Sequence, residues 1–240
     1  PKIKKNIIFQ NQKIILKYEK DSLSIDGKGE VFLQNEIDKI EYKIYKKKDE
    51  IKFNTTLNIL KNPFEIDLLN YKKKKNLDLV LNFKGRNSNN KELIFDEISL
   101  KEKNNLILIK NLILSNTSKI IDIDNIDINY VDESNIENIL QIKKKDKDYL
   151  ISGRSFSVDN IIEKLIDSEN EKNVELFNKN FDLIFDIEKV YLDKNNIIND
   201  LNGFLSFTEN EISELNLESK FDNQKNIKFT IKNNGEEKIT

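Results

Sequence analysis

Hydrophobic and polar residues alternate with a period of two along most of the chain, which is the pattern of a β-strand with one apolar face. The alternating runs cover residues 31–33, 40–44, 51–59, 77–83, 126–130, 181–187, 201–207, 215–217 and 227–231. Short clusters of Lys, Asn, Asp and Ser separate these runs and favour turns. The sequence therefore predicts a mainly β protein, built as a long antiparallel meander in a single segment spanning 1–240.

Residues 157–169 break the alternation and have helical spacing. One stripe carries Val158, Ile161, Ile162, Leu165 and Ile166. Ser157 is a good helix cap, because a serine hydroxyl accepts a hydrogen bond from the first free backbone N–H groups. We therefore expect strands over about 1–153, one short amphipathic helix over about 157–169, and strands over about 173–240.

One predicted strand, residues 105–115, is apolar on both faces. A strand of this kind needs cover on both sides. The apolar stripe of the helix is the natural cover for its outer face.

The apolar strand faces must be removed from water, since each buried Leu, Ile or Phe contributes roughly 1.5–3 kcal/mol. A helix of about 12 residues is only ~18 Å long and cannot cover about a dozen strands. Two sheets can pack as a sandwich, the sheet can close as a barrel, or it can curl into a trough filled by other molecules. A membrane barrel is disfavoured, because the chain has no Trp and only 7 Tyr for aromatic girdles. The alternation alone does not choose between sandwich and trough.

Composition removes several classes of chemistry. The chain has no Cys and no His, which excludes a thiolate nucleophile, an imidazole base and the usual zinc and haem sites. Ser155 and Ser157 have no base to activate them. Residues 122–127 are rich in Asp but lack the glycine of a calcium loop. We expect no enzyme activity, no cofactor and no metal.

Three lysine clusters, residues 46–48, 72–75 and 143–145, could suggest a nucleic-acid partner. A nucleic-acid binder should be basic overall and carry Arg or aromatics near its patch. The net charge is −2 and only Arg86 and Arg154 are arginines, so we expect no nucleic acid. Lysines at strand ends also prevent edge-to-edge aggregation. A lysine rim near lipid headgroups is a secondary hypothesis.

Two segments resemble the AsmA-like superfamily, in particular its YhdP-like branch. Residues 148–159 read Asp-Tyr-Leu-Ile-Ser-Gly-Arg-Ser-Phe-Ser-Val-Asp, similar to a strand that ends in Gly-x-Ser-Phe-Asp and leads into a short Ile-Ile-x-x-Leu helix. Residues 190–207, followed by a hairpin over 211–221, look like the family's C-terminal region. The resemblance covers roughly 120–235, and Ser157 stands where the family pattern has Asp.

This resemblance implies a β-groove: a long curled antiparallel sheet with an apolar concave face, as in bridge-like lipid transfer proteins. It implies movement of phospholipid between the inner and outer membranes, with acyl chains and membranes as partners. It also implies a periplasmic body tethered to the inner membrane through an N-terminal segment missing here. The chain opens with Pro1 and ends on a polar run, so we expect a fragment of a longer protein.

On this interpretation the apolar residues of the alternating strands line the groove. They are Ile51, Phe53, Leu57, Ile59, Leu77, Leu79, Leu81, Phe83, Ile126, Ile128, Phe181, Leu183, Phe185, Leu205, Phe207, Leu215, Leu217 and Phe229. The alternative is a structural β-sandwich or solenoid module of a surface or scaffold protein, in which the same residues fill their own core. The lipid species, the direction of transport and the oligomeric state stay open.

Overall fold

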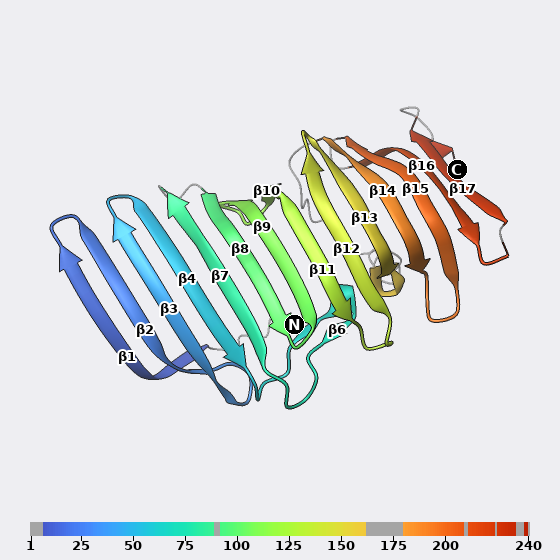
Figure 1. Ribbon diagram of the computed structural model, residues 1–240. Coiled ribbons are helices and arrows are strands. Elements are labelled where there is room, and N and C mark those ends of the chain that lie inside the picture. The colour runs from blue at the N-terminus through green and yellow to red at the C-terminus, as the bar shows by residue number, and fades with distance from the viewer. Residues whose placement is uncertain are drawn as a thin grey trace.

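The computed structural model describes residues 7–88, 92–161, 180–208, 211–223, 225–233 and 238–239. Within them the chain is mainly β, as predicted, and almost all strands belong to one sixteen-stranded sheet. Fifteen strands follow one another in chain order across the sheet (Figure 1), and β10 pairs only with β9. This order is that of a meander, in which each strand pairs with the next along the sequence.

The strands of the large sheet are β1 (Ile8–Glu19), β2 (Ser22–Phe32), β3 (Ile37–Lys47), β4 (Glu50–Ile59), β7 (Leu79–Ser88), β8 (Glu92–Glu102), β9 (Asn105–Ser115), β10 (Ile120–Asp122), β11 (Asn125–Val131), β12 (Glu137–Lys145), β13 (Asp148–Ser157), β14 (Phe181–Tyr191), β15 (Ile197–Thr208), β16 (Glu211–Phe221), β17 (Asn226–Asn233) and β18 (Lys238–Ile239). A separate two-stranded sheet consists of β5 (Glu65–Ile66) and β6 (Tyr71–Lys72). Among the described residues no second large sheet packs on the first, so the sandwich arrangement is not found.

The sheet is mixed, which corrects the expectation of a purely antiparallel one. β13 and β14 are parallel, with Tyr149 opposite Leu183 and Ser157 opposite Tyr191. Parallel neighbours need a crossover connection of a dozen or more residues, because the chain must return to the end at which the first strand began. Residues 158–180 lie between these two strands in the sequence, and this stretch is long enough for such a connection.

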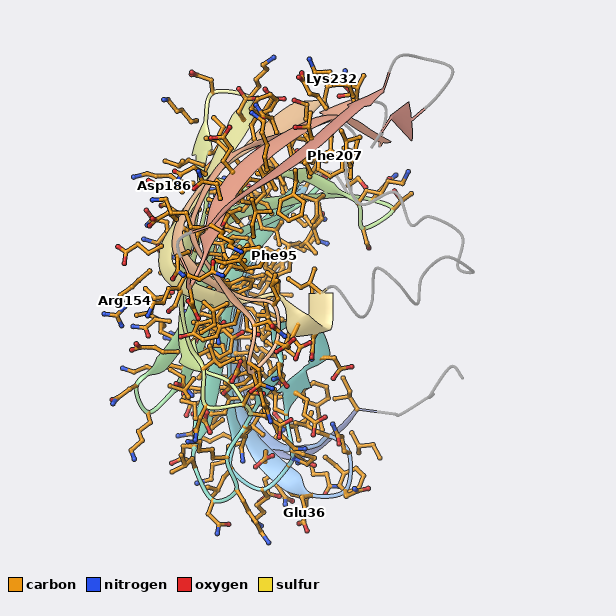
Figure 2. All side chains as sticks on the ribbon, turned by 90° about the vertical axis from the view of Figure 1, so that its right-hand side faces the viewer. Glu36, Phe95, Arg154, Asp186, Phe207 and Lys232 are labelled. Atoms are coloured by element: carbon orange, nitrogen blue, oxygen red, sulfur yellow. The ribbon has the colours of Figure 1, made fainter. Side chains whose placement is uncertain are left out.

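The sheet is bowed but open (Figure 2): it is neither closed into a barrel nor strongly curled. Its two faces carry different side chains, and in Figure 2 Phe95 and Phe207 lie on one side while Arg154 and Asp186 lie on the other. We call the first side the core face, because the buried apolar cluster of the protein lies on it. The second side is the outer face.

The predicted helix begins on the core face, not on the outer face of β9 as expected. Residues 159–161 are helical, whereas the expected remainder, 162–169, lies outside the described residues. Val158 and Ile161 pack against the core cluster. Ser157 is the buried last residue of β13, and its role as the helix cap stays a prediction.

A left-handed residue in β9 explains why its sequence looked apolar on both faces. Asn111 has a left-handed backbone, with φ of 51°. The alternation changes phase at this residue, so the apolar positions on its two sides do not follow one period. Ile109 faces Ile98, and beyond Asn111 Leu112 faces Phe95, all on the core face. Leu106 remains on the outer face and is 37% exposed.

Part of the core face is covered by the chain itself. Between β4 and β7 the chain leaves the large sheet for residues 60–78, which form β5, β6 and the short 3-10 helix η1 (Asp67–Leu69). Four apolar side chains of this covering segment pack on the core cluster: Phe64, Ile66, Leu69 and Tyr71. Tyr130 of β11 donates from its hydroxyl to the Leu69 carbonyl, which fixes the segment to the sheet beneath it.

Buried polar groups fasten the start of the covering segment. The amide oxygen of Asn62 accepts the backbone N–H groups of residues 34–36 at 3.2–3.3 Å, and its Nδ2 donates to Asp38 Oδ2 at 2.7 Å. The Asp38 carboxylate also accepts the backbone N–H groups of residues 60–62. Asn62 is 1% exposed and Asp38 is 4% exposed. Such buried groups are stable only when their hydrogen bonds are made.

Glu102 fastens the other end of the covering segment. Its carboxylate accepts the Tyr71 hydroxyl at 2.8 Å and the backbone N–H of Lys74 at 2.7 Å, and Glu102 is 1% exposed. Burial, followed by the bond to Glu102, raises the pKa of Tyr71 above its ordinary value. The phenol therefore stays protonated and keeps donating this bond.

We predict that Asn62→Ala destabilises the protein by about 2–4 kcal/mol, because it leaves several buried polar groups unpaired. Urea unfolding followed by circular dichroism measures the change. Asn104→Ala, at the exposed tip of the β8–β9 hairpin, is the matched control and should stay within about 0.5 kcal/mol of the wild type. Equal losses in both variants would contradict a fastening role for Asn62.

Acid should weaken the hydrogen bonds between the Asp38 carboxylate and the start of the covering segment. Burial alone would raise the pKa of the Asp38 carboxyl, but hydrogen bonds from residues 60–62 outweigh it and hold that pKa below its ordinary value. A carboxyl with a lowered pKa in the folded state contributes stability above about pH 4, which is lost as the pH falls through the folded pKa. Asp38→Asn should therefore lower stability at neutral pH and flatten the decline between about pH 5 and pH 3. An unchanged pH profile in this variant would contradict the assignment.

Candidate functional site

Two rows of side chains cross the core face from strand to strand. Residues opposite one another on neighbouring strands lie on the same face, so the strand register defines each row. The covered row is Ile40, Leu57, Leu81, Leu100, Ile107, Ile128, Leu140, Gly153, Ile187 and Leu201. The open row is Tyr42, Thr55, Phe83, Ile98, Ile109, Ile126, Ile142, Ile151, Phe185, Gly203, Leu217 and Phe229.

The two rows differ in exposure although they lie only two residues apart along each strand. All of the covered row except Leu57 and Gly153 is buried, with exposed fractions of 4–8%. In the open row only Ile151 is buried; Phe229 is 47% exposed and the rest are half-buried. The covering segment and the start of the helix pack on the core cluster and account for this difference.

No charged side chain interrupts the open row. Its only polar members are Tyr42 and Thr55, near the β1 edge of the sheet. The row crosses twelve strands, which at about 4.8 Å per strand makes it roughly 50 Å long. It is therefore a long, half-exposed apolar strip that water does not solvate well.

The outer face carries the opposite chemistry over most of its width. The row next to the open row, on the other face, begins Lys43, Asn54, Lys84, Glu97, Lys110, Asn125 and Lys143. It then turns apolar at three neighbouring strands, with Leu150, Ile184 and Phe204. This outer row is thus mostly polar from β3 to β12 and apolar over β13–β15.

The register places the predicted lining residues on the core face, in four successive zones. Nearest the covering segment, Ile59 and Leu79 are 2% and 0% exposed. The covered row contains Leu57, Leu81 and Ile128, and the open row contains Phe83, Ile126, Phe185, Leu217 and Phe229. Beyond the open row lie Ile51, Phe53, Leu183, Leu205, Phe207 and Leu215, which are half-buried, and Phe181, which is buried beside the Tyr149 and Phe207 rings. Leu77 comes before β7 begins at Leu79, so the predicted strand starts too early.

Four isoleucines of the open row were not among the predicted lining residues: Ile98, Ile109, Ile142 and Ile151. They lie in runs where bulges interrupt the period of two, such as the register shifts at Lys84/Gly85 and at Ile139/Leu140. The sequence shows the alternation within each short run. It does not show which strand lies next to each run, and only this pairing shows that the four isoleucines continue the same row.

The acidic side chains at 122–127 form hydrogen bonds and an ion pair with neighbouring side chains of the sheet. Asp122 forms an ion pair with Lys144 and accepts the Tyr149 hydroxyl at 3.3 Å. The hydrogen bond to Asp122 raises the pKa of Lys144, so the ammonium stays charged. Asp124 accepts from Asn111, and Asp127 accepts from Asn125 and Gln141.

Within the described ranges, no group of three or more acidic, histidine or cysteine side chains is arranged to hold a metal ion. In the same part of the chain, no helix combines the length and the apolar character needed to cross a membrane.

No family model, curated protein or solved structure matches the chain. The functional assignment therefore depends on the geometry of the core face and on the sequence resemblance.

The different burial of the two rows predicts that two substitutions on β14 destabilise the protein by different amounts. Ile187→Asp would place a charge in the covered row and should cost about 4 kcal/mol or more, because the carboxylate is buried without a partner. Phe185→Asp, one position along the same face in the half-exposed open row, should cost about 1–2 kcal/mol. Denaturant unfolding of both variants measures the difference. Equal destabilisation would mean that the two rows are equally covered.

Proposed function

We propose that this chain is a lipid-binding segment of an AsmA-like protein, which conducts phospholipids along its apolar face between the inner and outer membranes. The observation that carries the proposal is the open row, an uncharged, half-exposed apolar strip about 50 Å long beside the buried covered row. An acyl chain spans half of a ~30 Å bilayer core, or about 15 Å. The strip is about three times that length, so it suits a path better than a pocket for one molecule.

The energetics of such a path are favourable for movement. Each buried CH₂ group contributes about 0.8 kcal/mol, so one acyl chain on the strip is held by several kcal/mol. Sliding from one Ile to the next exchanges like surface for like and breaks no hydrogen bond. In this proposal the protein binds and guides lipid without chemistry, and works in the periplasm as part of a longer, membrane-tethered chain.

The second candidate is the structural module, and one observation favours it. The covering segment already buries the covered row, as a self-filled core would. In that case the open row would be a margin of the core and would hold no ligand. The two proposals differ in whether lipid occupies the open row.

Lipid extraction from the purified protein followed by mass spectrometry tests the proposal. The Phe83→Asp/Phe185→Asp variant places two charges in the open row and should lose co-purified phospholipid. Phe204→Asp is the matched control, because Phe204 is a half-buried phenylalanine on the outer face of the neighbouring strand. It should retain the lipid.

All three proteins must give the same circular dichroism spectrum for the comparison to hold. Phospholipid retained in the double variant, or a wild-type protein that carries none, would contradict lipid binding at the open row and support the structural module.

A further inference from the structure

A cleft of ≈ 630 Å³ lies between the covering segment and the turn that follows β11. Lys61 and residues 72–75 of the covering segment line it together with Asp132 and Glu133 after β11, and Leu60, Pro63 and Val131 add apolar surface. Since a water molecule occupies about 30 Å³ of liquid, the cleft has room for a group much larger than one water.

The positive charge of this cleft is not balanced by its acids. Lys72 forms ion pairs with Glu65 at 3.1 Å and with Glu133 at 3.6 Å, and these carboxylates compensate its positive charge. Asp132 is occupied by the backbone N–H of Ile136 and the amide of Asn138. Among the ion pairs of the described residues, none involves the other four lysines of the cleft: Lys61, Lys73, Lys74 and Lys75.

Lys73 is the most unusual of these lysines, because it is only 7% exposed. Its ammonium donates to the Leu60 carbonyl at 2.9 Å and, at a long 3.5 Å, to the Lys74 carbonyl. An ammonium has three N–H donors, and a buried one is costly unless an anion is near. Both acceptors are neutral carbonyl groups, and among the ion pairs of the described residues none joins Lys73 to a carboxylate.

We infer that this cleft binds a phosphate group, with Lys73 as the fixed donor and the exposed Lys61, Lys74 and Lys75 around it. Lysine binds phosphate as a compact point charge, and several of them can share one anion. The apolar surface of Leu60 and Val131 suits the carbon skeleton that carries the phosphate. The group can be a lipid headgroup, which would rest on the proposed function, or a free phosphate, which would not.

Titration calorimetry with two probes tests the inference: inorganic phosphate, and a short-chain phosphatidic acid below its micelle concentration. Lys74→Gln/Lys75→Gln removes two exposed lysines of the cleft, and Lys101→Gln/Lys103→Gln removes two exposed lysines near the β8–β9 turn, outside it. The cleft variant should bind about tenfold more weakly, at roughly threefold per lysine, and the control should match the wild type. Added salt should weaken the wild-type binding.

The outcomes distinguish a lipid headgroup from free phosphate, and they distinguish the phosphate site from the proposed lipid path. Lysine-dependent binding of phosphatidic acid alone supports the site and assigns it to a headgroup, whereas equal binding of both probes assigns it to phosphate itself. Phe185→Asp should leave inorganic phosphate binding unchanged, so a failure of the lipid path would not be mistaken for a failure of this site. Binding of neither probe, or equal binding by the wild type and the cleft variant, would overturn the inference.

Discussion

A sheet with one apolar face cannot leave that face in water, and the rest of this structure follows from that constraint. The alternation gives a broad apolar surface, because each strand adds its side chains to the rows of its neighbours. Among the described residues, no second large sheet covers this surface. The chain uses instead one excursion, residues 60–78, and the start of a helix at Val158.

This solution makes the core face asymmetric. The excursion covers the positions near Leu79 and leaves those near Phe83 half-exposed, on the same strand. Buried polar groups hold it in place: Asp38 and Asn62 at its start and Glu102 at its end. Packing and hydrogen bonding thus divide one continuous apolar face into a buried core and a half-exposed surface.

The period of two predicted the strands and their common face, because that signal is local. It could not predict which strands are neighbours, so the parallel pair of β13 and β14 and the placement of Val158 on the core face were missed. Residues 60–78 carry no clear period, and their fit depends on contacts far away in sequence, such as Asn62 with Glu36. Nothing in the run of lysines at 72–75 marks Lys73 as buried. Its burial follows from the excursion, which only the fold reveals.

Thiol accessibility tests the division of the core face most directly, since the chain has no cysteine of its own. Single substitutions Leu81→Cys and Ile128→Cys sample the covered row, and Phe83→Cys and Ile126→Cys sample the open row on the same strands. We expect fast reaction with a water-soluble maleimide in the open row, slowed by added phospholipid, and slow reaction in the covered row with or without lipid. Equal rates in both rows would contradict this division of the core face.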